Sequence, residues 1–131
     1  KWIFTPHPGE MGRLLDLSTQ KINSQRINVA LTAYAKLGVN IVLKGSPTII
    51  AGDKQLYINS TGNSGMGTAG MGDVLSGIIG GLLCQGMDPF LAAVAGTYLH
   101  GKAGDTLLES VGNRGMIATD ILQNLPTLMK G

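Results

Sequence analysis

The sequence predicts an α/β fold in which a mainly parallel sheet is flanked by helices. Residues 24–37 have apolar side chains at helical spacing, and Gly38 ends that pattern. The segment that follows, Val39–Leu43, is short, apolar and rich in β-branched residues. Such a run is typical of a strand buried on both faces, as strands are in parallel sheets. The 131 residues, 44% of them hydrophobic, are enough for one compact domain.

The first part of the chain predicts a short strand and a helix. Residues 2–4, Trp-Ile-Phe, form an apolar run that stops at Pro6, because proline cannot continue a strand ladder. Pro8 and Glu10 suit the first and third positions of a helix that extends to about Leu17. A strand with no element before it favours a chain that starts inside a domain.

The rest of the chain predicts a hairpin and three helices. Strands are expected at residues 48–51 and 55–58, with Gly52-Asp53 as the hairpin turn. Helices are expected at about 71–85, 88–108 and 118–124, the second with Asp88 as N-cap and Pro89 as its first residue. There is no internal repeat and no low-complexity linker, which favours one continuous domain.

Charge and composition disfavour several classes of protein. The net charge of +2 is spread along the chain without a basic block, and few aromatic residues are present, so nucleic-acid binding is not expected. No segment approaches about 18 uninterrupted apolar residues, and the first residues lack the order of a signal peptide, so no membrane partner is expected. The single cysteine, Cys84, is expected to pack as a small apolar residue, which fits a cytoplasmic protein.

Residues 59–84, NSTGNSGMGTAGMGDVLSGIIGGLLC, contain two groups of glycines. The first group matches the G-x-G-x-x-G spacing of dinucleotide-binding folds, but two helices follow where that fold needs a strand. Glycines 65–72 can instead turn backbone N–H groups toward one point at a helix N-terminus, which predicts an anion site. The second group, Gly77, Gly80 and Gly81 with Cys84, forms a stripe that predicts close approach of another helix.

Asp73 lies in the first turn of that helix, beside the predicted anion site. A phosphate would repel this carboxylate unless a hydroxyl group lay between them. The arrangement suits a base that takes a proton from a hydroxyl as it attacks a phosphoryl group. From the residues alone, a capping or helix-dipole acid is an equally good interpretation of Asp73.

Two other loops follow predicted strands and carry polar groups. The loop at 44–48, Lys-Gly-Ser-Pro-Thr, suits a nucleotide because ligands bind at the carboxyl ends of parallel strands, although an ordinary turn with a solvated lysine also explains it. The loop at 5–10, Thr-Pro-His-Pro-Gly-Glu, holds His7 stiffly between prolines. Helix capping explains Glu10, and a surface histidine explains His7 equally well.

Taken together, these motifs resemble the NAD(P)H-hydrate dehydratase family. The resemblance rests on T-P-H-P-G-E, V-L-K-G-S-P-T and N-x-G-M-G-T-A-G-M-G-D-V-L-S-G, followed by L-H-G-K-A-G-D ending at Asp105, in this order over essentially the whole chain. The family repairs hydrated nicotinamide cofactors and has the ribokinase-like α/β fold. The resemblance therefore implies that residues 1–131 are the C-terminal part of such a carbohydrate kinase-like domain.

The resemblance also implies roles for individual residues. His7 and Asp73 match contacts to the hydrated cofactor, and Asp73 is the implied catalytic base. The implied nucleotide contacts are Lys44, Gly45, Ser46, Pro47 and Thr48 in one loop and Thr68, Ala69, Gly70 and Gly72 in the other. The implied nucleotide is ADP, with ATP as the alternative, and Mg²⁺ would accompany its phosphates, although the sequence shows no cluster of metal ligands.

The implied reaction phosphorylates the ring hydroxyl of (6S)-NAD(P)H hydrate and then eliminates phosphate, which restores NAD(P)H. Two alternatives stay open: a ribokinase-like kinase acting on a small alcohol such as hydroxyethylthiazole, and a partial domain that binds adenine nucleotide without turnover. Besides the substrate and the nucleotide, the expected partner is a second copy of the chain, or a companion chain that supplies an N-terminal half.

Overall fold

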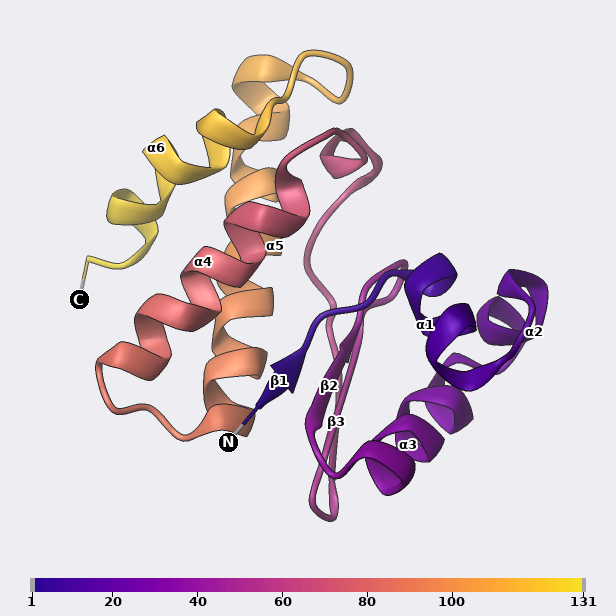
Figure 1. The fold of residues 1–131 in the computed structure, drawn as a ribbon. Helices are drawn as coiled ribbons and strands as arrows, with labels where there is room; N and C mark the ends of the chain where they lie inside the picture. The colour runs from indigo at the N-terminus through magenta and orange to yellow at the C-terminus, as the bar shows by residue number, and fades with distance from the viewer. Residues whose placement is uncertain (1, 131) are drawn as a thin grey trace. The chain divides into compact units, whose positions relative to one another are not determined.

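The computed structural model describes residues 2–130, which fold as two compact units. Of the described residues, the first unit contains 2–59 and 88–94, and the second contains 60–87 and 95–130. The strands are β1 (Ile3–Phe4), β2 (Asn40–Leu43), β3 (Ile49–Gly52) and β4 (Gln55–Ile58). The helices are α1 (Pro8–Leu15), α2 (Thr19–Ser24), α3 (Arg26–Leu37), α4 (Met71–Cys84), α5 (Pro89–Val111) and α6 (Ala118–Leu128), with a short 3₁₀ helix η1 (Ser64–Met66) (Figure 1).

The strands form one mixed sheet in the first unit, in the order β1-β2-β3-β4 (Figure 1). β1 is parallel to β2, whereas β2 with β3 and β3 with β4 are antiparallel. The prediction of a mainly parallel sheet is therefore wrong for the described strands, although an α/β architecture is confirmed. The physical reason is the length of the connections, because residues 44–48 and 53–54 are too few for the crossover that parallel neighbours require.

The turn between β3 and β4 lies one residue later than predicted. Asp53 and Lys54 form it, and Lys54 has a left-handed φ of 53°. Gly52 pairs with Gln55 and belongs to β3. This glycine serves close packing, since a Cβ at position 52 would lie 2.6 Å from the Phe90 ring and 2.7 Å from Asn40 Oδ1.

The helix predicted at residues 24–37 is α3, which begins at Arg26, and a separate short helix, α2, precedes it. Gln25 between them has φ −138° and ψ 42°, which interrupts the helical backbone. α2 was not predicted, yet its start has a local cause: the Ser18 hydroxyl accepts a hydrogen bond from the Lys21 N–H at 3.2 Å, as an N-cap does. The other helices begin and end within a few residues of the predicted positions.

The core of the first unit lies between the sheet and helices α1, α2 and α3. Ile41, Val42 and Leu43 of β2 are all fully buried, which confirms a strand buried on both faces. One face of the sheet packs on the helices through an apolar cluster formed by Met11, Ile22, Val29, Ala30, Ala33, Ile41, Leu43, Ile49 and Ala51. Burial of each large side chain in it stabilises the fold by about 1.5–3 kcal/mol.

The second unit packs α4, α5 and α6 around a smaller cluster, formed by Met71, Val74, Ala103, Met116 and Ile121. α5 approaches α4 closely at Gly96, where a Cβ would lie 2.6 Å from Ile79 Cγ1. The predicted role of the glycine stripe is wrong within residues 2–130, because Cβ atoms at positions 77, 80 and 81 would meet no atom within 4 Å. Cys84 is exposed, so its predicted packing is also wrong.

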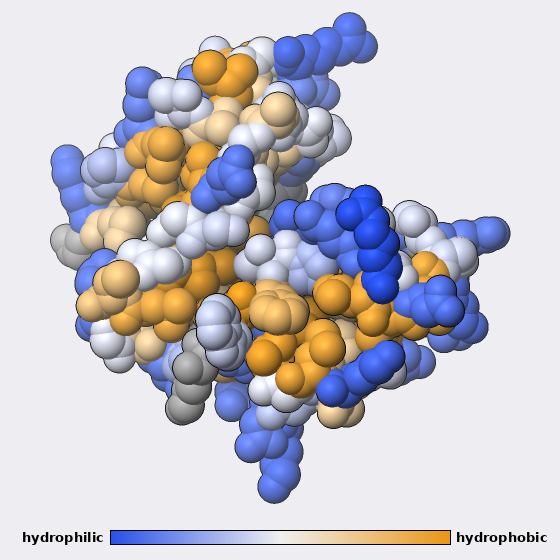
Figure 2. Space-filling view, viewed as in Figure 1, coloured by the Kyte–Doolittle hydropathy of each residue, from blue (hydrophilic) through white to orange (hydrophobic). Residues whose placement is uncertain are grey.

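The surface mixes polar and apolar residues, as the visible face in Figure 2 shows. Trp2, Leu91 and Ile117 are each more than half exposed. Within residues 2–130, no helix combines the length and the apolar character needed to cross a membrane.

Candidate functional site

The first unit brings the two predicted loops at 5–10 and 44–48 into contact. The Lys44 N–H donates a hydrogen bond to the Pro6 carbonyl at 2.9 Å, and Lys44 Nζ lies 3.9 Å from Glu10 Oε2. These loops follow β1 and β2, which are parallel neighbours, so both leave the same edge of the sheet. The polar residues of the two loops therefore gather at the carboxyl ends of two parallel strands, where α/β proteins commonly bind ligands.

His7 is the N-cap of α1. Its Nδ1 accepts a hydrogen bond from the Glu10 N–H at 3.1 Å, and Glu10 Oε2 accepts one from the His7 N–H at 2.7 Å, which together form a capping box. Pro8 and Glu10 occupy the first and third helical positions, as predicted. Because Nδ1 is an acceptor, the proton of the neutral ring is on Nε2, and this half-exposed edge can donate a hydrogen bond to a ligand.

The Glu10 carboxylate connects His7 with Lys44. Its Oε1 lies 3.5 Å from His7 Nε2, and its Oε2 faces Lys44 Nζ. The hydrogen bond from the His7 backbone holds the pKa of Glu10 below its ordinary value, with further help from the positive charges of Lys44 and Arg13, against an opposing effect of burial. Glu10 therefore stays ionised and fixes both loops.

The stabilising effect of Glu10 is expected to disappear in acid. Since folding lowers its pKa, its contribution is complete above the ordinary glutamate value of about 4.3 and is lost as the pH falls through the lower value of the folded state. Urea unfolding should show Glu10→Gln to be less stable than the wild type at neutral pH, and this difference should shrink as the pH falls below the ordinary glutamate pKa. A difference that grows in acid would contradict this role.

The loop at 44–48 is cross-linked by Thr48. The Thr48 hydroxyl accepts a hydrogen bond from the Gly45 N–H at 3.3 Å and donates one to the Gly45 carbonyl at 3.1 Å. Gly45 and Ser46 are exposed, and Lys44 is half-buried. The ammonium of Lys44 and the backbone and hydroxyl of Ser46 are thus the groups of this loop best placed to meet a ligand.

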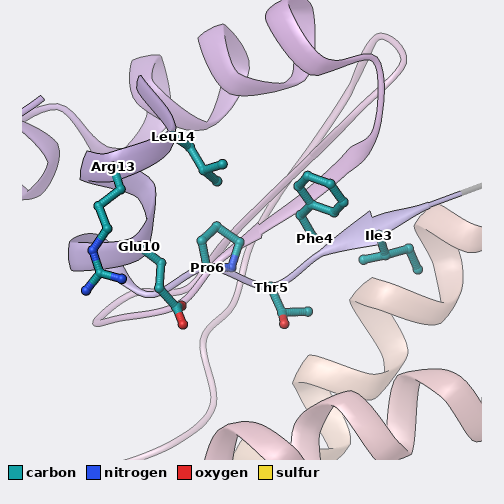
Figure 3. A pocket seen from close by; sticks show the side chains of 7 residues that line it. All are labelled: Ile3, Phe4, Thr5, Pro6, Glu10, Arg13 and Leu14. Atoms are coloured by element: carbon teal, nitrogen blue, oxygen red, sulfur yellow. The ribbon is translucent and has the colours of Figure 1, made fainter. Parts of the chain in front are cut away.

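A pocket of about 490 Å³ opens beside these loops in the first unit. Ile3, Phe4, Thr5 and Pro6 line it together with Glu10, Arg13 and Leu14 of α1. Figure 3 shows the apolar side chains of Phe4, Pro6 and Leu14 around the hollow, with the charged groups of Glu10 and Arg13 at the α1 side. His7 and Lys44 do not line the pocket. Both contact Glu10, which does line it.

In the second unit, Asp105 of α5 holds the start of the glycine loop. Its Oδ2 accepts a hydrogen bond from the Gly62 N–H at 3.0 Å, and its Oδ1 accepts one from the Asn63 side-chain amide at 3.1 Å. Asn63 Oδ1 in turn accepts a hydrogen bond from the Gly65 N–H at 3.0 Å and caps η1. One carboxylate thus fixes the loop directly and through Asn63.

Two glycines of α5 allow this loop to lie against the helix. A Cβ at Gly101 would lie 2.8 Å from the Gly62 nitrogen and would overlap Thr61, and a Cβ at Gly104 would overlap Met66. Both lie in the H-G-K-A-G-D segment, so its glycines and its aspartate serve the same contact. The Thr61 hydroxyl adds a hydrogen bond to the Tyr98 carbonyl at 3.0 Å.

The glycine loop ends at the N-terminus of α4, where Asp73 is the third helical residue. Gly70, the N-cap, has φ 84° and no side chain, so no side-chain oxygen caps the first turn of the helix. Asp73 is exposed, and Gly72 before it is half-buried. The first N–H groups of α4 and the exposed carboxylate of Asp73 therefore lie together, an arrangement that suits an anion site next to a base.

His100 lies under the start of α4. Burial lowers the pKa of His100, and a hydrogen bond with the Met71 backbone opposes that shift. Its Nε2 is buried and has no hydrogen-bond partner among residues 2–130. The ring is therefore neutral near neutral pH and supports the backbone at the first residue of α4 without adding charge beside Asp73.

The residues predicted to form the site fall into two groups, one in each unit. The first unit contains His7 and the loop at 44–48, and the second contains Thr68, Ala69, Gly70, Gly72 and Asp73. Sequence reasoning missed the side chains that support these groups: Arg26, which donates hydrogen bonds to the loop at 44–48, Asp105 and His100. For Asp105 and His100 a signal was present in the L-H-G-K-A-G-D segment, whereas no local pattern marks Arg26.

The described residues offer no cluster for a metal ion. Across residues 2–130, no group of three or more His, Cys, Asp and Glu side chains is arranged to hold one.

The fold is that of the ribokinase-like superfamily, as comparison with known proteins shows. A solved ribokinase-like superfamily protein from Enterococcus faecalis matches 97% of this chain with a TM-score of 0.83 and 40% identity, and the match covers 43% of that protein. The predicted fold class is thereby confirmed.

Within that superfamily, the chain belongs to the NAD(P)H-hydrate dehydratase family, whose model matches residues 1–127. It is 49% identical over 129 residues to the bifunctional NAD(P)H-hydrate repair enzyme of Moorella thermoacetica, covering 98% of this chain and 24% of that enzyme. The crystal structure of the ADP/ATP-dependent NAD(P)H-hydrate dehydratase from Bacillus subtilis, co-crystallised with ATP and Mg²⁺, matches with a TM-score of 0.92 and 34% identity. That match covers 96% of this chain and 46% of the Bacillus protein, so this chain spans less than half of both relatives.

Proposed function

We propose that this chain provides the nucleotide loop and the catalytic aspartate of an enzyme that dehydrates (6S)-NAD(P)H hydrate at the expense of an adenine nucleotide. The observation that carries the proposal is the exposed carboxylate of Asp73 in the first turn of α4, which no side chain caps. Family membership and the names of the Moorella and Bacillus relatives support the substrate and the nucleotide.

The chemistry requires a better leaving group than hydroxide. Asp73 takes the proton of the ring hydroxyl as this oxygen attacks the terminal phosphoryl group of the nucleotide, so an O–P bond forms and the bond to the departing nucleotide breaks. The lone pair of the ring nitrogen then expels phosphate, and loss of a ring proton restores the double bond of NAD(P)H. Backbone N–H groups at Thr68, Ala69, Gly70 and Gly72 stabilise the negative charge that the phosphoryl oxygens carry.

The two loops of the first unit bind the ligands in this proposal. Lys44, Gly45, Ser46, Pro47 and Thr48 hold the nucleotide, and His7 donates a hydrogen bond from Nε2 to the hydrated cofactor. ADP is the proposed nucleotide and ATP the alternative, in line with the dual name of the Bacillus relative. Mg²⁺ would bind through the nucleotide phosphates, since the described residues form no cluster for it.

We further propose that activity requires the part of the domain that this chain does not span. It can be supplied by the same polypeptide, by a companion chain or by a second copy of this one. The shares of 24% and 46% of the two relatives support this proposal. These low shares also favour a second candidate function, in which the chain is a partial domain that binds adenine nucleotide without turnover. We also propose that the protein is cytoplasmic.

The proposal is tested with the complete encoded polypeptide, with NADH hydrate or NADPH hydrate, and with ADP or ATP in the presence of Mg²⁺. We expect the absorbance of reduced nicotinamide to return and one phosphate to be released for each cofactor repaired. A stable phosphorylated alcohol would instead identify a kinase. Calorimetric binding of the nucleotide without turnover would identify the partial nucleotide-binding domain.

A further inference from the structure

Arg26, the first residue of α3, extends its guanidinium group behind the loop at 44–48. Nη2 donates hydrogen bonds to the carbonyls of Lys44 at 2.9 Å and Leu43 at 3.2 Å, and Nε donates one to the Pro47 carbonyl at 3.1 Å. Nη1 donates to Asn23 Oδ1 at 3.0 Å, which orients the group from α2. A single side chain thus contacts the beginning and the end of the loop.

These contacts determine the shape of the loop. The carbonyls of Leu43 and Lys44 lie where the chain leaves β2, and that of Pro47 lies where it approaches β3, so a planar group with fixed donor directions draws both ends together. Three N–H groups of the guanidinium bind these carbonyls, and a fourth binds Asn23. The carbonyls of Leu43, Lys44 and Pro47 are thereby satisfied, Lys44 Nζ faces Glu10, and Ser46 is left exposed.

The position of Arg26 is unfavourable for its own helix. A cation in the first turn is repelled by the positive end of the helix dipole, and Gln25, the N-cap, makes no side-chain capping hydrogen bond. Among residues 2–130, no carboxylate lies within 4.0 Å of Arg26 to neutralise it. Residues that break the preferences of helix capping and of the helix dipole occur mainly at functional sites. Here the positive charge of Arg26 adds to that of Lys44 beside the loop.

Gly45 and Arg26 depend on each other. The backbone of Gly45 passes directly over the guanidinium, and a Cβ at this position would overlap Cζ, Nη1 and Nη2 of Arg26. Gly45 also has φ 149°, which other residues rarely adopt. Only glycine therefore lets the chain close over this side chain.

We propose that Arg26 is a positioning residue that sets the shape of the loop at 44–48 for an adenine nucleotide. The inference rests on the proposed function for the identity of the ligand, and on the geometry alone for the shaping of the loop. Arg26 contacts the ligand only through the loop. Its loss should therefore weaken nucleotide binding and leave the chemical step nearly intact.

The test compares Arg26→Ala and Arg26→Met with Lys36→Met in the complete encoded polypeptide. Lys36 is exposed near the other end of α3, so its replacement removes the same charge from the same helix. We expect the Kd and KM for ADP to rise about tenfold or more in both Arg26 variants, from lost hydrogen bonds to a charged group, with kcat changed less than about twofold. Lys36→Met should behave as the wild type.

A second arm uses guanidinium ion at a concentration far below denaturing levels. The ion should restore ADP affinity to Arg26→Ala, where the truncated side chain leaves space for it, and should not restore it to Arg26→Met, where the side chain fills that space. Arg26→Lys should stay weak, because an ammonium group cannot serve three carbonyls in the directions of a planar fork. A merely structural role would not produce this pattern of rescue.

The outcomes separate the inference from the proposed function. If the wild type binds no adenine nucleotide, the proposed function fails, and hydrogen exchange still decides the role of Arg26. In Arg26→Ala the amides of Lys44 and Gly45 should exchange at least about tenfold faster and slow again with guanidinium ion. Wild-type ADP affinity in Arg26→Ala, or unchanged exchange at these amides, would overturn the inference. If an Arg26 variant fails to fold, Asn23→Ala, which removes the acceptor that orients Nη1, should weaken ADP binding in the same direction and to a smaller extent.

Discussion

Replacement of Asp73 by Asn is expected to reduce turnover by about 10²-fold or more in the complete encoded polypeptide, because the amide cannot accept the proton of the attacking hydroxyl. The exposed position of Asp73 in the first turn of α4 means that the change disturbs little packing. The KM for ADP should change far less than kcat, since the asparagine still fits beside the N-terminus of the helix. Steady-state kinetics with NADH hydrate measures both.

Asp120→Asn is the matched control for this prediction. Asp120 is also the third residue of a helix in the second unit, where its Oδ2 accepts a hydrogen bond from the Ile117 N–H at 2.8 Å. The Asp120→Asn variant should lose some stability, because its helix cap is weakened, and should keep normal turnover. Near-normal turnover of Asp73→Asn with an unchanged fold would remove Asp73 from the catalytic role and leave it as a helix-dipole acid.

Replacement of Asp105 by Ala is expected to release the glycine loop. The change removes the acceptors of the Gly62 N–H and of the Asn63 amide, and hydrogen bonds to charged groups contribute about 1.5–3 kcal/mol each when shielded from solvent. Because Asp105 is half-buried, we expect the free energy of unfolding to fall by about 2 kcal/mol in total. Urea unfolding measures this loss, and hydrogen exchange at Gly62 and Gly65 should show that it is local.

Activity should respond to the same change, because the loop leads directly into the N-terminus of α4 beside Asp73. Asp105→Asn keeps one acceptor oxygen and should lose roughly half as much stability as Asp105→Ala. Glu109→Gln, one turn further along α5 and exposed, is the control and should leave both stability and turnover unchanged. Wild-type stability and turnover in Asp105→Ala would show that the loop holds its shape without this carboxylate.

Most of the fold could be predicted from the sequence because its signals are local. Helical periodicity and caps identify α1, α4, α5 and α6, and β-branched residues identify the central strand β2. The differences between the predicted and the observed elements also have local causes. Ser18 caps α2 without a long apolar pattern after it, and Gly52 makes room for Phe90 instead of forming the predicted turn.

The site was predictable only in part because its supports are distant in sequence. His7, Asp73 and the loop at 44–48 belong to compact motifs, and the structure places each on the expected loop or helix end. Arg26 bonds carbonyls that are 17 to 21 residues away, and Asp105 bonds groups that are 42 and 43 residues away. No spacing rule relates residues so far apart, so only the folded chain shows which side chains hold the loops in shape.

The contact between Gly45 and Arg26 restricts the order in which related chains can change. A side chain at position 45 is blocked twice, by the guanidinium and by the backbone angle, so loss of Arg26 alone does not free the glycine. Arg26, in contrast, can be replaced first while Gly45 stays. Among homologues, glycine should therefore persist at position 45 where arginine has been lost from position 26, and arginine should rarely occur opposite any other residue at position 45.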